Sequence, residues 1–191
     1  AHELTTDELK RHAINIKNSV TNSLDLIDNT LYWSLSQMGN IQYSPSNFSL
    51  PHLLEKLRGL YQLTADKKRI PLSISWDEDI ILHGDENMIY VTLRNLVSNA
   101  LKFTDAGTVR VPARLAADTD MIVFSVTDTG VGIARENHRR VFEEFSQVEN
   151  PLQKSVKGTA VGLPLSQRLA GLLGGSIDVD SEIGKGSVFS L

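Results

Sequence analysis

A carboxylate followed by two glycines ends one apolar run of the sequence. Asp128 closes the run from Met121, and Gly130 and Gly132 follow it. Glycine lets a backbone come close to a ligand, and a partly buried carboxylate accepts hydrogen bonds from an amino group. The pattern therefore predicts a site for a ligand that bears an amino group. The same spacing also makes tight turns, so this motif alone does not decide between the two.

Two asparagines, Asn95 and Asn99, lie four residues apart on one face of a predicted helix. A carboxamide oxygen is a suitable hard ligand for Mg²⁺, which keeps several waters and shares the phosphates of a nucleotide. Lys102 lies about one turn further on, where its ammonium group can reach such phosphates as a point charge. Taken alone, the pair also fits solvated or helix-capping asparagines.

A glycine-containing segment, residues 157–163, precedes another predicted helix and reads Lys-Gly-Thr-Ala-Val-Gly-Leu. Free backbone N–H groups and the helix dipole favour an anion at such a position. In isolation the segment also fits an ordinary loop. Near the end of the chain, Gly184-Lys185-Gly186-Ser187 frames the last strands, as turn residues do.

The elements that position these residues follow from the apolar periodicity. In the predicted helices apolar residues recur in steps of three and four, and in the predicted strands they alternate with polar residues. No regular strand, helix, strand rhythm of a parallel sheet is present, which favours an α+β sandwich with helices on one face of a mixed sheet. We expect a polar loop at 42–47, helices at about 50–67, 86–103 and 162–173, a short helix after the glycine turn, and strands at about 72–76, 80–82, 109–115, 121–126, 176–180 and 187–191.

A single long helix is predicted ahead of this sandwich. Its apolar stripe is uninterrupted by Gly or Pro and consists of Leu9, Ala13, Ile16, Val20, Leu24, Ile27, Leu31, Leu35 and Met38. Thr5 and Glu8 form a capping box before it, and Gly39-Asn40 ends it. A narrow seam of this length favours a coiled coil or helical bundle, the alternative being a helix that lies across its own domain.

Composition narrows the classes of function. The 191 residues suit one core with an extension, and the net charge of −4 without a basic stripe argues against nucleic acid as a partner. Cysteine is absent, which excludes disulfides and thiolate metal sites and favours a cytoplasmic location. No membrane span or signal peptide is evident, so we expect any membrane anchor to lie outside this chain.

In this order, the motifs resemble those of sensor histidine kinases of two-component systems. The resemblance covers nearly the whole chain, and Tyr32-Trp33-Ser34-Leu35-Ser36-Gln37 looks like the end of that family's second dimerisation helix. The matching motifs are Asn95-x-x-x-Asn99 for the N box, Asp128-x-Gly130-x-Gly132 for the first glycine box, Phe142-Glu143-Glu144-Phe145 for the F box, and Gly158-Thr159-x-x-Gly162-Leu163 for the second glycine box.

The resemblance implies a Bergerat-type ATP-binding fold over residues 41–191, with three main helices, and a second dimerisation helix over 1–40. It implies that Asp128 recognises the adenine amino group, that Asn99 binds Mg²⁺ with Asn95 in support, and that Lys102 contacts phosphates. Residues 146–157 would form a mobile lid. The other positions that it assigns to nucleotide binding are Phe103, Gly130, Gly132, Ile133, Lys157, Gly158, Thr159, Gly162, Leu163 and Ser187.

The implied activity is transfer of the γ-phosphate of Mg-ATP to a histidine on a dimerisation helix, for relay to the receiver domain of a response regulator. The full-length protein would be a homodimer. The gyrase, Hsp90 and mismatch-repair ATPases share this fold, but they carry a water-activating glutamate where this chain has Asn95. Transfer to an acceptor is therefore favoured over hydrolysis, because transfer relies on positioning and charge neutralisation.

Two departures from the family pattern stand out. His2-Glu3-Leu4-Thr5-Thr6 echoes the phosphoacceptor motif without its arginine and proline, and only one helix follows it, so we expect the acceptor helix to be absent. His12 lies inside that single helix, where we expect a surface or bundle residue, and His52, His83 and His138 lack ligand-like spacing. Ala160-Val161 replaces the usual glycine and leucine, which puts nucleotide affinity in doubt if the backbone there needs positive φ. A degenerate nucleotide-binding or dimerising module is therefore the alternative function.

Overall fold

The computed structural model describes residues 5, 12, 27, 31, 32, 34, 41–117, 119–146 and 160–191. Contacts between Cα atoms divide the chain into two units, Ala1–Ile41 and Gln42–Leu191. In the first unit, the described residues His12, Ile27, Leu31, Tyr32 and Ser34 are helical. The rest of the predicted long helix lies outside the described residues.

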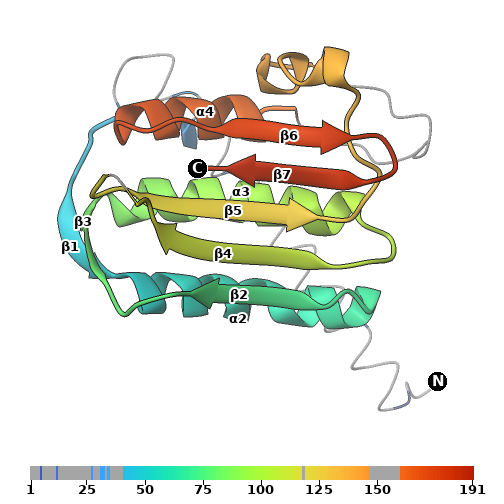
Figure 1. Ribbon diagram of the computed structural model, residues 1–191, viewed down its shortest axis with the longest axis horizontal. Coiled ribbons are helices and arrows are strands. Elements are labelled where there is room, and N and C mark those ends of the chain that lie inside the picture. The colour runs from blue at the N-terminus through green and yellow to red at the C-terminus, as the bar shows by residue number, and fades with distance from the viewer. Residues whose placement is uncertain are drawn as a thin grey trace. The chain divides into compact units, whose positions relative to one another are not determined.

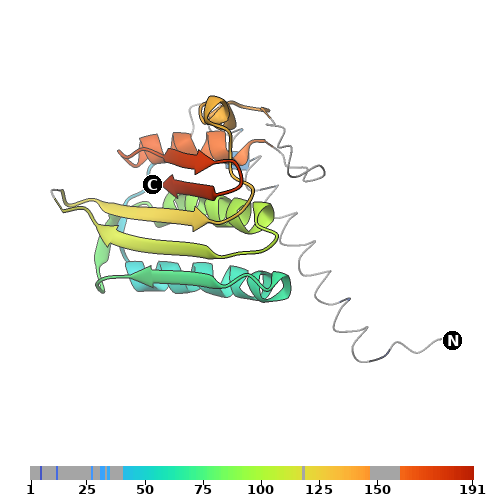
Figure 2. The ribbon, with the colours of Figure 1, turned by 45° about the vertical axis from the view of Figure 1, so that its right-hand side comes forward.

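The second unit is a two-layer α+β sandwich in which three helices cover one face of a five-stranded sheet (Figures 1 and 2). The strand order is β2-β4-β5-β7-β6; β2 runs parallel to β4 and the other pairs are antiparallel. This confirms the predicted fold class. The helices are α2 (Leu50–Lys68), α3 (Glu86–Phe103) and α4 (Gly162–Leu172), and the strands are β2 (Leu72–Trp76), β4 (Val109–Leu115), β5 (Ile122–Asp128), β6 (Asp178–Glu182) and β7 (Gly186–Ser190).

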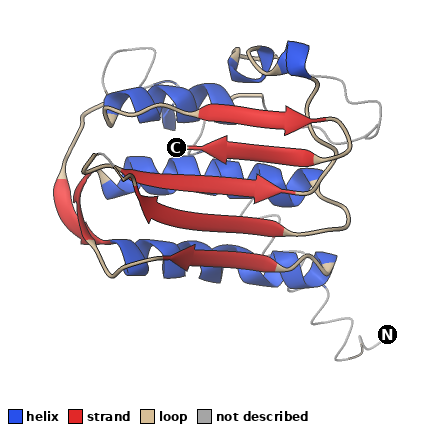
Figure 3. Cartoon of the chain, in the orientation of Figure 1, coloured by secondary structure: helices blue, strands red, loops and turns tan. Residues whose placement is uncertain are grey.

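A second, two-stranded sheet contradicts part of the predicted polar loop at 42–47. β1 (Ser46–Ser49) pairs antiparallel with β3 (Ile81–Gly84), at one end of the larger sheet (Figure 3). The sequence of β1 is Ser-Asn-Phe-Ser, which has one strongly apolar residue and no alternation. Pairing with a distant strand and burial of Phe48 therefore decide its conformation, not local propensity.

Alternation along β5 brings a carboxylate to the core face of the sheet. Phe124, Val126 and Asp128 are its buried residues, at 1%, 0% and 6% exposure. Side chains two residues apart on a strand point to the same face, so Asp128 continues the inward row that Phe124 and Val126 begin. The strand thus places a carboxylate at its end, beneath the layer of helices.

Helix α3 crosses the middle of this layer and bears the second group of predicted site residues. Its N-cap is Asp85, whose side chain accepts a hydrogen bond from the Met88 backbone N–H at 3.1 Å. At its other end, the Lys68 ammonium donates to the carbonyl oxygens of Leu101 and Thr104, at 2.6 and 2.7 Å. A cation is favourable at this helix terminus, so Lys68 fixes the turn that contains Lys102.

The remaining predictions of secondary structure were close. Two short 3-10 helices, Arg135–Asn137 and Arg140–Phe142, occupy the place of the predicted short helix. Strand β6 begins two residues later than predicted and β7 one residue earlier. In the part of the chain that the structure describes, no helix has the length and apolarity needed to cross a membrane.

Candidate functional site

Asp128 is held by hydrogen bonds from two sides. Its Oδ1 accepts from the Gly130 backbone N–H at 2.8 Å, and Ser187 on the neighbouring strand donates with both its backbone N–H and its hydroxyl. Burial raises the pKa of the Asp128 carboxyl, and the hydrogen bonds from Gly130 and Ser187 oppose that rise. The side chain is thus a buried acceptor whose orientation is fixed.

The two glycines after Asp128 lie against protein backbone. A Cβ on Gly130 would lie 2.3 Å from the Phe103 carbonyl oxygen, and a Cβ on Gly132 would lie 1.9 Å from that of Glu182. Gly132 also has a φ of 69°, and the intervening Val131 N–H donates to the Phe103 carbonyl at 3.2 Å. Residues 128–133, the glycine loop, therefore pack tightly between the end of α3 and the β6–β7 turn, with no room for side chains at the glycines.

The next residue of this loop, Ile133, contacts two residues that the sequence analysis did not assign to the site. Its backbone N–H donates to the Ser181 hydroxyl oxygen at 2.8 Å, and its carbonyl faces His138 Nε2 at 3.3 Å. The same nitrogen of His138 lies 3.0 Å from the Ser181 carbonyl oxygen. The end of the glycine loop is therefore tied to β6 by three polar contacts.

Asn95 joins helix α3 to helix α4. It is 6% exposed, and its Nδ2 donates to the Gly162 carbonyl oxygen at 3.3 Å and to the Ser166 hydroxyl at 3.2 Å. Asn99 lies one turn further along α3 and is partly buried. The structure thus places the first asparagine of the pair as a tie between helices and leaves the second nearer the end of α3.

Lys102 and Phe103 form the last turn of α3. The Lys102 Nζ lies 5.2 Å from the centroid of the Phe103 ring, within the range of a cation–π contact. Lys102 is half-buried, and burial lowers the pKa of its ammonium group. A partly desolvated cation here is well suited to an anionic group, because its charge is less screened than at an open surface.

Helix α4 begins at Gly162 without a side-chain cap. The backbone N–H groups of Gly162 and Leu163 fall in the first turn, where no intrahelical acceptor exists, and Pro164 has none to offer. Ala160, just before the helix, has a φ of 54°, so the backbone at this position is left-handed as a glycine would allow. The predicted residues Lys157, Gly158 and Thr159 lie outside the described residues.

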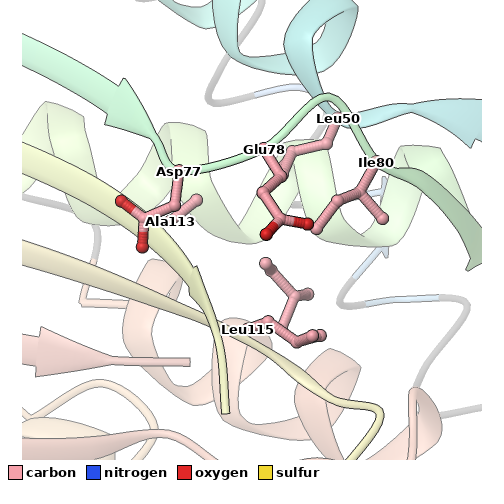
Figure 4. Close-up of a pocket in the computed structure, with 7 residues that line it drawn as sticks. Leu50, Asp77, Glu78, Ile80, Ala113 and Leu115 are labelled. Atoms are coloured by element: carbon pink, nitrogen blue, oxygen red, sulfur yellow. The ribbon is translucent and has the colours of Figure 1, made fainter. Parts of the chain in front are cut away.

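The structure thus brings most of the predicted residues into two neighbouring groups that α3 connects. One group surrounds Asp128 and meets α3 at the Phe103 carbonyl; the other joins Asn95 to the start of α4. A separate cavity of about 190 Å³ contains none of these residues (Figure 4). It is lined by Leu50, Asp77, Glu78, Ile80, Ala113, Leu115 and Ile122.

A family model described as the histidine kinase-, DNA gyrase B- and HSP90-like ATPases matches residues 84–191. The chain belongs to this family. The match includes α3, the glycine loop and α4, and so contains every predicted site residue. Within the ATPase family, three similar curated proteins are sensor or hybrid histidine kinases, in agreement with the resemblance in the motifs.

Hybrid signal transduction histidine kinase B of Dictyostelium discoideum is 33% identical over 97% of this chain and 10% of its own length. Sensor protein GacS of Pseudomonas syringae pv. syringae is 36% identical, and RcsC of Escherichia coli K12 is 32% identical, over 91% and 98% of this chain. The chain spans 20% of the length of each of these two sensors.

Solved structures agree on the fold. Full-length ShkA in complex with AMPPNP superposes with a TM-score of 0.74 at 29% identity, over 99% of this chain and 39% of ShkA. The histidine kinase AdeS of Acinetobacter baumannii gives a TM-score of 0.71 at 18% identity, over 99% of this chain and 84% of AdeS. The second likeness shows the shared fold alone.

Sequence reasoning missed Ser166, Ser181 and His138 in this ATPase-family site. Ser166 lies 71 residues from Asn95 in the chain, and Ser181 lies 48 residues from Ile133. No local pattern marks a lone serine on a helix or strand as the partner of so distant a residue. The available signal was the position of Ser181 just before the turn Gly184-Lys185-Gly186, which pairs β6 with β7 and so brings Ser181 opposite Ser187.

Proposed function

We propose that this chain is the ATP-binding core of a sensor histidine kinase, which binds Mg-ATP and presents the γ-phosphate to a histidine of a dimerisation helix. The observation that carries the proposal is the buried Asp128 carboxylate, held by Gly130 and Ser187. Its fixed acceptor suits the amino group of adenine, which donates hydrogen bonds. The AMPPNP complex of ShkA, a similar protein over nearly the whole of this chain, supports a nucleotide as the ligand.

We assign the phosphates of the nucleotide to the residues at the end of α3 and the start of α4. Lys102 contributes a half-buried positive charge, and the first turn of α4 contributes the N–H groups of Gly162 and Leu163, which have no acceptor within the helix. Asn99 supplies a carboxamide oxygen to Mg²⁺, which is held jointly by that oxygen, waters and phosphates. Phe103 and Ile133 border the nucleotide, and Lys157, Gly158 and Thr159 complete the phosphate loop.

Phosphoryl transfer is preferred to hydrolysis on the basis of Asn95. Its amide nitrogen is engaged by Gly162 and Ser166, and a carboxamide cannot take up a proton from water as a carboxylate can. The site offers positioning and charge neutralisation, which are the main requirements of phosphoryl transfer. The acceptor histidine is then supplied by a helix outside the ATP-binding unit.

We assign residues 1–40 to the second helix of the dimerisation hairpin and 41–191 to the catalytic domain. Ile27 and Leu31 are 59% and 54% exposed, which suits a seam that packs against another helix. The partners of the full-length protein are then a second copy of itself and the receiver domain of a response regulator. For a unit that passes phosphate to such a receiver domain, we propose a cytoplasmic location.

Isothermal titration of the chain with AMPPNP tests the proposal, with and without Mg²⁺. Binding by the wild-type chain and weaker binding by Asp128→Asn are expected, because an amide donor replaces part of the acceptor; a charge-assisted hydrogen bond contributes about 1.5 to 3 kcal/mol. Asn99→Ala should reduce the dependence on Mg²⁺. Equal affinity of wild type and Asp128→Asn would remove Asp128 from the site.

Transfer is tested by mixing the chain with ATP and a separately supplied dimerisation hairpin that contains an acceptor histidine. Acid-labile phosphate should appear on the supplied hairpin and not on the chain alone. Phosphate on His2 or His12 would show that the acceptor lies in this chain. The alternative, a degenerate binding module, rests on the left-handed Ala160, and it predicts nucleotide binding without transfer or no binding.

A further inference from the structure

A row of hydrogen bonds connects the two ends of the glycine loop through strands β6 and β7. The Ile133 backbone N–H donates to Ser181 Oγ at 2.8 Å, Ser181 Oγ lies 3.0 Å from Ser187 Oγ, and Ser187 donates to the Asp128 carboxylate. Ser181 and Ser187 face each other in the register of β6 and β7. Among the predicted nucleotide-site residues that the structure describes, Ser181 contacts Ile133 and Ser187, and it reaches Asp128 only through Ser187.

The direction of these bonds follows from the chemistry of their ends. A backbone N–H only donates and an ionised carboxylate only accepts, while each serine hydroxyl has one proton to give. Ser187 gives its proton to Asp128, so its oxygen is free to accept from Ser181. The Ser181 proton lies between Ser187 Oγ and the Gly186 carbonyl oxygen, the latter at 2.8 Å. The Ser181 proton is therefore shared between these two acceptors, and the part of its interaction that is directed at Ser187 strengthens the bond from Ser187 to Asp128, because successive bonds polarise one another.

His138 adds polar contacts to two residues of this row, Ile133 and Ser181. Its Nε2 faces the carbonyl oxygens of Ile133 and Ser181, at 3.3 and 3.0 Å, and both of these groups are acceptors. The hydrogen of the ring is therefore on Nε2. Ile133 is then bound to Ser181 directly through its N–H and indirectly through its carbonyl, which leaves the loop little freedom to shift along β6.

We propose that Ser181 is a positioning residue for adenine recognition, acting through Ser187 on Asp128 and through Ile133 on the glycine loop. This inference rests on the proposed nucleotide function. Without the Ser181 hydroxyl, the Ser187 hydroxyl loses its neighbour and can rotate away from Asp128, and the Ile133 N–H loses its acceptor. The carboxylate then binds the adenine amino group in a less well defined orientation, whereas the phosphate contacts at Lys102 and α4 are unchanged.

The test is the affinity of the chain for ATP and for ITP, which has the same phosphates but a carbonyl in place of the amino group. Ser181→Ala should weaken ATP binding by about tenfold, the equivalent of one good hydrogen bond, and change ITP binding much less. Ser181→Thr keeps the hydroxyl and suits a strand, so it should retain the wild-type ratio of affinities. Ser190→Ala on β7 is the matched control and should also retain it.

Thermal unfolding of each variant shows that the fold is intact, and Ser181→Cys, which keeps the volume but weakens the hydrogen bond, replaces Ser181→Ala if the latter does not fold. An equal loss of ATP and ITP binding in the alanine or cysteine variant, or an unchanged ratio, would overturn the positioning role. A wild-type chain that does not prefer ATP to ITP would instead refute adenine recognition by Asp128, and with it this inference.

Discussion

The Phe145 backbone N–H donates to the Ala160 carbonyl oxygen at 3.2 Å, and both residues have left-handed backbones, with φ of 58° and 54°. Phe145 is the last residue of the F-box motif, and Ala160 is the second residue before α4. A left-handed backbone at a non-glycine residue costs about 1 to 2 kcal/mol. The bond therefore joins two strained positions, and it fixes where the chain enters α4.

Replacing Ala160 with glycine should relieve that cost. If ATP selects the left-handed form because its phosphates meet the first turn of α4, Ala160→Gly should tighten ATP binding by about fivefold, which corresponds to about 1 kcal/mol. Adenosine has no phosphates, and its affinity should stay the same. Calorimetric titration with both ligands measures the difference.

The control for this prediction is Ala116→Gly, at a residue whose backbone is not left-handed. It should leave both affinities unchanged and lower the free energy of unfolding by up to about 1 kcal/mol, because glycine increases the freedom of the unfolded chain. If Ala160→Gly behaves like Ala116→Gly, Ala160 is a harmless variant of the family motif.

The close approach of Gly132 to the Glu182 backbone leads to a second prediction, on stability. Gly132→Ala should lower the free energy of unfolding by about 3 kcal/mol or more, since the new Cβ would lie 1.9 Å from the Glu182 carbonyl oxygen and must displace backbone, which adds an overpacking cost of about 1 to 3 kcal/mol to the about 1 to 2 kcal/mol of a left-handed alanine. Gly184 has a similar φ, 77°, but a Cβ added there would meet nothing within 4 Å. Gly184→Ala should therefore cost only about 1 to 2 kcal/mol. Urea denaturation of both variants checks the prediction, and equal costs would contradict it.

Much of the fold could be predicted because its main elements have strong periodic patterns. The bounds of α3 and β4 agree with those predicted, since both elements bury one face and carry clear end signals, such as Asp85 before α3. Strand β1 could not be predicted, because its conformation depends on pairing with β3, more than thirty residues further along the chain. Its own residues would suit a loop equally well.

For the site, too, the sequence could mark residues that form a short motif, but it could not reveal contacts between residues far apart in the chain. Asp128 and its glycines form one short motif, so the sequence could mark them. The glycines, however, turn out to lie against the backbone of Phe103 and Glu182, a contact that no local pattern reveals. Ser181 was missed for the same reason, because its role depends on strand register.

Lys68 allows a third prediction, on the end of α3. Lys68→Met should lower the free energy of unfolding by about 1 to 2 kcal/mol, because two charge-assisted hydrogen bonds to Leu101 and Thr104 are lost from a side chain that is one-third exposed. It should also weaken ATP binding, because Lys102 and Phe103 are in the turn that Lys68 holds. Lys67→Met, at the exposed neighbour, is the control, and an equal effect of the two substitutions would contradict this role.

The last prediction concerns pH and follows from the Asp128 carboxyl. Burial raises its pKa above the ordinary value of 3.8, so the folded chain takes up this proton at a higher pH than the unfolded chain does. Stability should therefore fall as the pH rises through the window between these two values, and Asp128→Asn should lack that fall. Adenosine binding should change in the opposite sense: it should weaken as the pH falls through the raised pKa, because a protonated carboxyl no longer offers the ionised acceptor to the adenine amino group. Adenosine is the ligand of choice, since it has no phosphates that titrate. Affinity measured across the acidic range in wild type and Asp128→Asn tests the assignment, and an acid-induced loss that persists unchanged in Asp128→Asn would show that another group is responsible.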